Sequence, residues 1–259
     1  MDRLYCACFD TGGELIFLKS ERDIDAIKSS GGRDSEEFLP LVSLQNVSLG
    51  YDSTPVVQAV SLAIYPGSLI GLAGPNGSGK TTLFRTILGL LPPIGGTLSR
   101  NCPLSNFGYV PQSAALDPQF PLSASEVVEM GAYGRVRPYE FLPASEKERV
   151  IEVLHQIGLP QLAARSFFSL SGGQKQRMLI ARALMVNPNI MILDEPLSGV
   201  DEESRRSITD LLTKLTREKG LAVFFSSHDL EMVQRVADSI VRIDKGQIWL
   251  DERKARLQP

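Results

Sequence analysis

The sequence predicts an α/β fold with a mainly parallel sheet, because short apolar strands alternate with amphipathic helices along most of the chain. Residues 68–73, Ile190–Leu193 and 222–226 are apolar runs of the kind that is buried on both faces of a parallel sheet. A segment rich in helix signals, about residues 113–168, interrupts this alternation. We therefore expect a helical subdomain inserted into an α/β core.

The first part of this core is rich in strands. Residues 42–49 and 57–64 alternate between apolar and polar side chains or run apolar, which predicts two strands. Residues 68–73 then form a short strand that leads into a glycine-rich loop. Residues 80–91 have the pattern of a helix, which we expect the following pair of prolines to end.

Two capping-box patterns open helices within the inserted segment. Ser123 precedes Glu126 by three residues, and Ser145 precedes Glu148 by the same spacing. In a capping box the serine hydroxyl accepts from a backbone N–H of the first helical turn, while the glutamate accepts from the N–H of the serine. We therefore expect a helix to begin directly after each serine.

The second half of the core continues the alternation. Helices are expected over residues 173–186 and over Glu202–Lys219, where four apolar residues share one face. These four residues are Ile208, Leu211, Leu212 and Leu215. After the strand at 222–226, residues 240–243 and 248–250 are expected to form two strands joined by a turn that contains Lys-Gly.

Residues 1–38 are expected to form an extension outside the core. Residues 3–9 and 14–19 are strand-like on either side of a Thr-Gly-Gly turn. Residues 21–29 fit one short helix, and the polar residues that follow fit a linker. No motif in this extension indicates a function.

The composition excludes several classes of function. A net charge of −3, a pI of about 5.6 and the lack of a Lys/Arg-rich run argue against nucleic-acid binding. No apolar stretch is long enough to span a bilayer and no signal peptide is evident, so we expect an intracellular protein that reaches a membrane only through another subunit. The three cysteines argue against a disulfide framework, and the Cys6-x-Cys8 pair lacks the further ligands of a tetrahedral metal site.

The loop between the strand at 68–73 and the helix at 80–91 carries the first chemical signal. It matches G-x-x-x-x-G-K-[ST], in which backbone N–H groups surround phosphates, the lysine reaches the β- and γ-phosphates and the final hydroxyl binds Mg²⁺. A glycine-rich turn before a helix is the plain alternative, and the full pattern disfavours it. The expected ATP-binding residues here are Gly74, Pro75, Asn76, Gly77, Ser78, Gly79, Lys80, Thr81 and Thr82.

The second signal is the acidic pair that follows the strand Ile190–Leu193. Asp194 is expected to hold Mg²⁺ through water, and Glu195 to polarise the attacking water. Adjacent residues at a strand end point in different directions, so two carboxylates can divide this work. A solvated acidic pair beside a turn is the alternative, which Pro196 and the unbroken apolar run before Asp194 disfavour.

The third signal is Leu-Ser-Gly-Gly-Gln at residues 170–174. Together with the phosphate loop and the acidic pair, it resembles the signature of the ATP-binding-cassette (ABC) family over residues 41–252. The resemblance implies a P-loop NTPase core with a mainly parallel sheet, an antiparallel β subdomain and an inserted α-helical subdomain. The signature residues implied to contact nucleotide are Ser171, Gly172, Gly173 and Gln174.

The resemblance also implies roles for four further residues. His228 would contact the γ-phosphate as a switch, and Gln112 would sense Mg²⁺ and the γ-phosphate and move the helical subdomain. Tyr51 would stack on adenine, and Asp201 would communicate across a dimer, although each residue type also has ordinary structural uses. The implied catalytic residues are Lys80, Glu195 and His228, and the implied Mg²⁺ site consists of Thr81, Gln112 and Asp194.

The same resemblance implies the partners. One chain carries one phosphate loop and one signature, and in the family two subunits pair head to tail so that each signature closes the nucleotide site of the other subunit. The homodimer would dock through its helical subdomains on integral membrane permease subunits, at the cytoplasmic face of the membrane. An extracytoplasmic substrate-binding protein would take part indirectly.

Three local features resemble the ATPases of bacterial zinc, manganese and iron importers. They are the Tyr-Val-Pro-Gln stretch at 109–112, the Asp-Pro-Gln-Phe-Pro stretch at 117–121 with the residues at 126–134 that follow it, and Ser-Gly-Val-Asp at 198–201. Siderophore and haem importers share much of this pattern, and a non-transport cassette such as an iron–sulfur assembly ATPase is a further alternative. In either kind of importer we expect no dedicated site for the transported ion on this chain.

Overall fold

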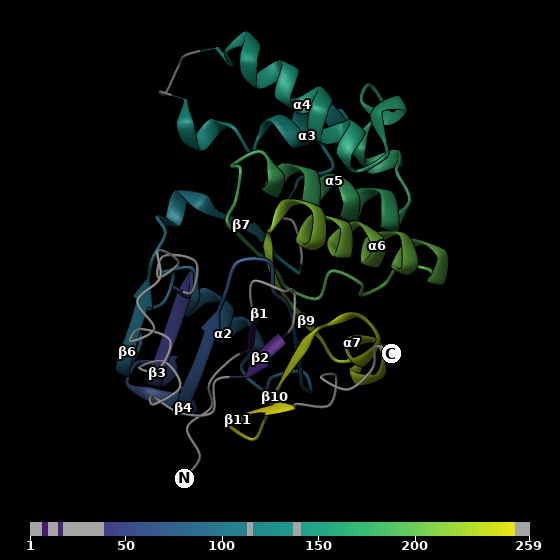
Figure 1. The fold of residues 1–259 in the computed structure, drawn as a ribbon. Helices are drawn as coiled ribbons and strands as arrows, with labels where there is room; N and C mark the ends of the chain where they lie inside the picture. The colour runs from purple at the N-terminus through teal and green to yellow at the C-terminus, as the bar shows by residue number, and fades with distance from the viewer. Residues whose placement is uncertain (1–6, 10–14, 18–38, 113–115, 137–140, 252–259) are drawn as a thin grey trace.

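A mainly parallel sheet lies at the centre of the computed structural model, which describes residues 7–9, 15–17, 39–112, 116–136 and 141–251 (Figure 1). Its strands are β5 (Leu69–Ala73), β7 (Phe107–Val110), β8 (Ile190–Leu193), β9 (Ala222–Ser227), β10 (Ser239–Asp244) and β11 (Gln247–Asp251). Within the described ranges, these six strands pair in the order β11-β10-β5-β9-β8-β7. All neighbours are parallel except β10 and β11. The predicted α/β fold is therefore confirmed.

The sheet is buried on both faces, which explains the continuous apolar runs in the sequence. Successive side chains of a strand point to opposite faces. Accordingly Phe224 and Phe225 of β9 belong to two different hydrophobic clusters, as do Ile192 and Leu193 of β8. The inner strands of the sheet therefore contribute apolar area to two cores at once.

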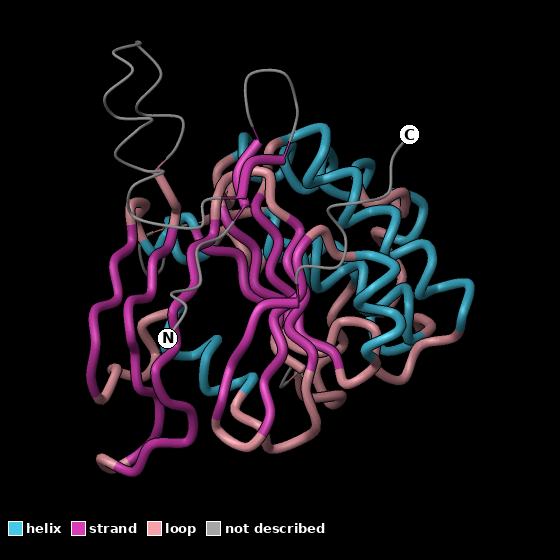
Figure 2. Tube along the Cα trace, turned by 60° about the horizontal axis from the view of Figure 1, so that its bottom comes forward, coloured by secondary structure: helices cyan, strands magenta, loops and turns pink. Residues whose placement is uncertain are grey.

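An antiparallel sheet and one helix cover the first face. The sheet consists of β3 (Val42–Tyr51), β4 (Thr54–Ile64) and β6 (Gly95–Arg100), in the order β4-β3-β6. The helix α2 (Lys80–Ile87) packs Phe84 edge-on against Phe224, with ring centroids 5.0 Å apart. Figure 2 shows these antiparallel strands on one side of the central sheet and most helices on the other. The antiparallel β sheet implied by the resemblance is thus present.

Helices cover the opposite face in two layers. The inner helices are α5 (Gly172–Leu184), α6 (Glu202–Lys219) and α7 (Leu230–Val236), and α3 (Ala124–Glu129) and α4 (Ala144–Gln156) lie beyond α5 (Figure 1). One hydrophobic cluster runs through these layers to the sheet, including Val127, Val153, Ile180, Leu212 and Phe225. The face of α6 that the sequence predicted to be apolar is buried in it.

The two predicted capping boxes have different outcomes. Ser123 caps α3 as predicted: its hydroxyl accepts from Glu126 N at 3.3 Å, and its N–H donates to Glu126 at 2.7 Å. The second prediction is wrong, because α4 begins at Ala144 with Pro143 as its N-cap. Ser145 is already inside the first turn, where it cannot adopt the extended backbone that an N-cap requires.

The helix α2 ends four residues earlier than predicted. Gly89 adopts the left-handed conformation with φ 73°. The N–H of Gly89 then donates to Thr86 O at 3.1 Å, and the N–H of Leu90 donates to Arg85 O at 2.8 Å. This is the Schellman arrangement, which satisfies the last carbonyls of a helix and ends it. A glycine therefore ends the helix before the prolines are reached.

Three short elements were not predicted from the sequence: β6, β7 and α7. In the extension, β1 (Ala7–Phe9) and β2 (Leu15–Phe17) pair antiparallel within the two predicted strand-like stretches. The helix predicted at 21–29 lies outside the described residues. No helix in the described part of the chain is long and apolar enough to cross a bilayer.

Candidate functional site

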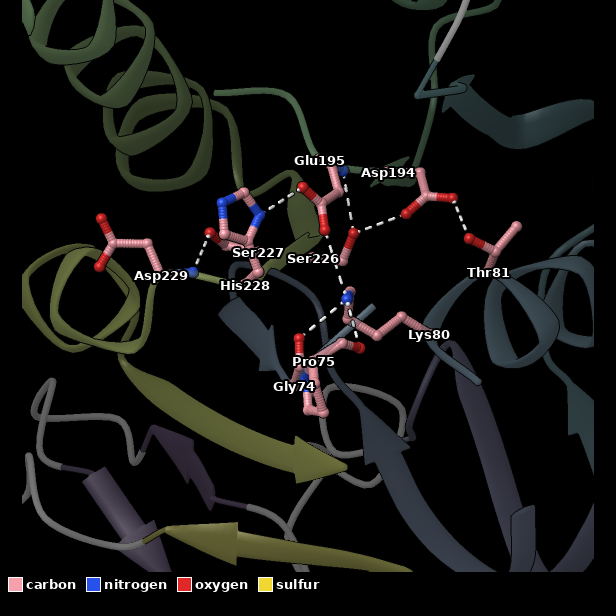
Figure 3. Close-up of polar contacts among 10 residues, drawn as sticks. All are labelled: Gly74, Pro75, Lys80, Thr81, Asp194, Glu195, Ser226, Ser227, His228 and Asp229. Carbon is pink, nitrogen blue, oxygen red and sulfur yellow. Dashed lines mark hydrogen bonds and ion pairs between the residues drawn. The ribbon is translucent and has the colours of Figure 1, made fainter. Parts of the chain in front are cut away.

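The residues predicted to bind and hydrolyse ATP lie close together where β5, β8 and β9 end (Figure 3). These neighbouring strands are parallel, so their carboxyl ends lie at one edge of the sheet, which is where α/β proteins commonly bind ligands. The phosphate loop follows β5, Asp194 and Glu195 follow β8, and His228 follows β9. The sheet thus brings together residues that are more than 100 positions apart in the chain.

The loop at 74–79 is shaped by its glycines. A Cβ on Gly74 would lie 2.3 Å from the carbonyl oxygen of Ile243, so only glycine fits there. Gly79 has φ 107°, which L side chains rarely adopt, and it precedes α2 without a side-chain cap. The N-cap therefore supplies no side-chain acceptor to the first N–H groups of α2, and such free N–H groups at a helix N-terminus suit phosphate.

The same loop holds a buried hydroxyl. Ser78 is 8% exposed, and its Oγ has no hydrogen-bond partner among the residues that the structure describes. An unpaired buried hydroxyl costs free energy, and an anionic ligand in the loop could accept from it. This orphaned donor and the uncapped start of α2 fit the phosphates of ATP.

Lys80 has all three of its N–H donors matched by acceptors. Nζ donates to Gly74 O at 2.9 Å and to Pro75 O at 3.1 Å, and it forms an ion pair with Glu195 Oε1 at 3.3 Å. The side chains of Lys80 and Glu195 are only 6% and 5% exposed. The positive charge is therefore held at the mouth of the glycine loop by the carboxylate predicted to activate water.

Asp194 is fixed through both carboxylate oxygens. Thr81 Oγ1 donates to Oδ2 and Ser226 Oγ donates to Oδ1, each at 2.6 Å. Thr81 belongs to α2 and Ser226 to β9, so the carboxylate joins two elements. The oxygen pair of Thr81 and Asp194 suits Mg²⁺, which takes one or two carboxylates together with substrate phosphates. Among the described residues, no group of three or more His, Cys, Asp or Glu could hold a metal ion.

Glu195 has an unusual backbone conformation. Its φ is 52°, in the left-handed region that costs a non-glycine residue about 1–2 kcal/mol. This turn separates the directions of the two acidic side chains, so that Glu195 meets Lys80 and His228 while Asp194 meets Thr81 (Figure 3). The two carboxylates therefore have different partners, although they are adjacent in the chain.

His228 lies at the open side of the site. Its Nδ1 lies 2.7 Å from Glu195 Oε2, and its side chain is 55% exposed. The next residue, Asp229, caps α7 by accepting from Met232 N at 3.0 Å, and its own N–H donates to Ser227 Oγ. The unpredicted helix α7 therefore fixes the chain that carries His228.

The signature residues do not join this network. Ser171 caps α5 in a capping box with Gln174. A Cβ on Gly173 would lie 2.1 Å from Ser204 Oγ, so the signature packs against the start of α6. Asp201 caps α6 by accepting from Ser204 N at 2.9 Å, and this hydrogen bond lowers the pKa of its carboxyl group. Ser171 makes its hydrogen bonds at its own helix, apart from Lys80 and Glu195.

Gln112 and Tyr51 lie at the margins. Gln112 is two residues beyond the end of β7, and the last residue of β7, Val110, accepts from Asp194 N at 2.8 Å. Tyr51 is 43% exposed, and its hydroxyl accepts from Arg85 at 3.4 Å. Their predicted contacts with Mg²⁺ and adenine stay predictions. Three residues before Gln112, burial and the charge of Asp194 raise the pKa of the Tyr109 phenol.

The comparisons with known proteins agree with this geometry. A family model described as "ABC transporter" matches residues 57–198. The manganese transport system ATP-binding protein MntB of Bacillus subtilis is 41% identical over 80% of this chain and 84% of its own length. The zinc import ATP-binding protein ZnuC of Yersinia pestis is 37% identical over 79% of this chain and 76% of its own length.

Solved structures are similar over the same region. A transporter described as of proposed metal-chelate ABC type, in an inward-facing conformation, matches with a TM-score of 0.76 and 28% identity, over 82% of this chain and 83% of that one. The cassette MJ0796, solved as a dimer after hydrolysis with ADP and phosphate, matches with a TM-score of 0.69 and 30% identity. That match covers 81% of this chain and 97% of the cassette.

Proposed function

Since this chain belongs to the ABC transporter family and is an ATP-binding ATPase, we propose that it is the motor subunit of a metal-ion importer. The proposal that the substrate is a metal ion rests on two relatives, named for manganese transport and for zinc import, which match about four fifths of this chain. The proposal that the chain hydrolyses ATP rests on the network of hydrogen bonds and ion pairs among Lys80, Thr81, Asp194, Glu195 and His228.

The network supports a sequence of events on ATP binding. All three donors of Lys80 are in use, so a phosphate oxygen must replace one of its present acceptors. If a phosphate oxygen took the place of the Glu195 carboxylate as the partner of Lys80, Glu195 Oε1 would lose its ion pair. Glu195, still oriented by His228, could then accept a proton from the attacking water. Binding of ATP would thereby release the residue that hydrolyses it.

Thr81 and Asp194 are the residues that we propose hold Mg²⁺, with Gln112 as a further contact. A bound Mg²⁺ supplies positive charge that stabilises the negative charge developing on the transferred phosphoryl group. Thr81 would then turn its hydroxyl from Asp194 to the ion. Ser226, which donates to Asp194 Oδ1 at 2.6 Å, would keep the carboxylate oriented once Thr81 no longer bonds to it.

We propose that ATP is bound between two copies of the chain paired head to tail. Ser171, Gly172 and Gly173 lie at the start of α5, where backbone N–H groups can donate hydrogen bonds to an anion, and Ser171 makes its hydrogen bonds with Gln174 rather than with Lys80 of its own chain. The signature of one copy would close the phosphate loop of the other. The dimeric state of the related cassette MJ0796 supports this arrangement.

The remaining parts of the proposal concern location and partners. Residues 41–252 would form the ATPase domain, with a helical subdomain at about 113–168 that docks on membrane permease subunits at the cytoplasmic face. The names of the relatives, as parts of manganese and zinc import systems, support such an assembly. A substrate-binding protein outside the membrane would deliver the metal. Residues 1–38 have no assigned role.

A second candidate substrate is a metal chelate such as a siderophore or haem. The similarity to the transporter of proposed metal-chelate type favours it, although the identity to that structure, 28%, is lower than to the manganese and zinc relatives. A non-transport cassette is disfavoured, because the relatives named above belong to transport systems.

Metal uptake by cells tests the proposed function. A strain lacking the chain should take up less radioactive manganese or zinc, and the wild-type chain should restore uptake. Glu195→Gln should not restore it at equal expression, because the motor cannot complete hydrolysis. Glu218→Gln makes the same chemical change on an exposed part of α6 and should restore uptake. Normal metal uptake in the deletion strain, with loss of haem or siderophore uptake instead, would favour the second candidate.

A further inference from the structure

Ser226 is a buried polar residue in an otherwise apolar strand. It is 0% exposed, while the residues before it in β9 belong to the two hydrophobic cores. By the alternation of the strand it shares the face of Phe224, on the side of α2 and the phosphate loop. A hydroxyl in such a place must be hydrogen-bonded, and its partners show what it does.

Both hydrogen bonds of Ser226 go to the acidic pair. Its Oγ donates to Asp194 Oδ1 at 2.6 Å and accepts from the backbone N–H of Glu195 at 2.9 Å (Figure 3). A hydroxyl has one donor and can accept at the same time, so one side chain satisfies both neighbours. The bond to a carboxylate is of the stronger, charge-assisted kind.

The bond to Glu195 supports a strained turn. At φ 52° the chain leaves the regular strand conformation, and the Glu195 N–H is paired with Ser226 instead of a neighbouring strand. Strained backbone of this kind persists only where its surroundings hold it. Ser226 therefore fixes the point at which the two carboxylates separate toward Thr81 and toward Lys80 and His228.

We infer that Ser226 is the positioning residue of the ATPase site, which sets the orientation of Asp194 and the backbone turn of Glu195 without touching nucleotide. This inference rests on the roles proposed for Asp194 and Glu195. Ser226 acts through them: one bond orients the Mg²⁺-binding carboxylate, and the other holds the residue that activates water. The neighbouring hydroxyl of Ser227 has a different task, accepting from Asp229 N at the start of α7.

Ser226→Ala tests the inference, since it removes one oxygen and leaves the strand apolar. We expect kcat per ATP-binding subunit to fall roughly tenfold or more, because a misplacement of about 1 Å can cost about 10²-fold in rate. Binding of a fluorescent ATP analogue in EDTA should be unchanged, whereas the Mg²⁺ concentration for half-maximal binding should rise. Thr216→Val, which also removes a buried hydroxyl, lies near the far end of α6 and should change none of these values.

A double variant separates positioning from a general structural effect. If Ser226 acts through the acidic pair, adding Ser226→Ala to Glu195→Gln should cost much less than Ser226→Ala costs alone. Fold-losses that multiply would overturn the inference, as would a Ser226→Ala kcat within twofold of the parent. An equal loss of kcat and of ATP binding in EDTA would also overturn it. A Glu195→Gln chain with normal turnover would instead contradict the role of Glu195 itself.

Discussion

Replacing Glu195 by glutamine is expected to slow ATP hydrolysis at least ~10²-fold while ATP binding is retained, because the amide cannot accept a proton from the attacking water. The side chain is almost the same size and can still meet His228, so the surrounding structure should persist. Removing the negative charge also removes the ion pair with Lys80, which should make that lysine easier to release to phosphate. Binding and hydrolysis should therefore separate in this variant.

Two measurements check this expectation. Turnover is measured by phosphate release at saturating ATP, and the ATP-bound variant is examined by light scattering, where a dimer is expected because the bound ATP is not consumed. The control is Glu218→Gln, whose exposed carboxylate pairs with Lys214 at 4.0 Å on the surface of α6. Turnover near that of the parent would show that another group activates water.

Replacing Lys80 by alanine is expected to act one step earlier, at nucleotide binding. We expect the dissociation constant for ATP to rise roughly 10- to 100-fold, because a hydrogen bond to a charged group contributes about 1.5–3 kcal/mol. The change also leaves Glu195 buried without its cationic partner, so a lower melting temperature is expected without ligand. Both effects follow from the position of Nζ at the mouth of the glycine loop.

Equilibrium binding of a fluorescent ATP analogue measures this effect. Lys219→Ala serves as the matched control, because it removes a lysine from the exposed end of α6, where no phosphate is expected. A Lys80→Ala chain that binds ATP as tightly as the parent would contradict the phosphate-loop assignment. A folded Lys80→Ala chain with weak binding would support it.

The elements that the sequence predicted best have strong signals at both ends. The helix α6 has its predicted bounds, because Asp201 caps its start and Gly220, with φ 64°, ends it. The strand β8 likewise begins and ends as predicted. The elements that were missed are short or glycine-containing: β6 begins Gly95-Gly96, and α7 has only seven residues. Tertiary packing, not local preference, decides such segments.

That the phosphate loop, the acidic pair and His228 lie together could be predicted from the sequence, because parallel strands have their carboxyl ends at one edge of the sheet. That rule brings Lys80, Asp194, Glu195 and His228 together before any coordinates are known. The role of Ser226 was not predictable in the same way, since a serine in an apolar run gives no sign of its partner. Strand alternation places Ser226 on the same face as Phe224, which indicates only where it is buried. Its bond to Glu195 depends on the positive φ of Glu195, which the sequence does not reveal.

The central claim is that ATP is hydrolysed in a composite site, with the phosphate loop of one chain and the signature of another. Lys80→Ala and Ser171→Arg should each abolish activity in a homodimer, because both sites are then damaged. In a mixed dimer, both lesions fall in one site and the other site keeps its native residues. In one chain Lys80 bonds within the phosphate loop and to Glu195, whereas Ser171 bonds with Gln174 at the start of α5, so the two lesions affect different parts of each chain.

The most direct measurement is therefore the ATPase rate of the two inactive variants after mixing in equal amounts. Random pairing makes half the dimers mixed, each with one native site, so about a quarter of the parent rate is expected if the sites work independently. Each variant alone, at the same total concentration, should remain inactive. Recovery on mixing supports the composite site. No recovery, together with an ATP-bound Glu195→Gln chain that stays monomeric, would contradict it.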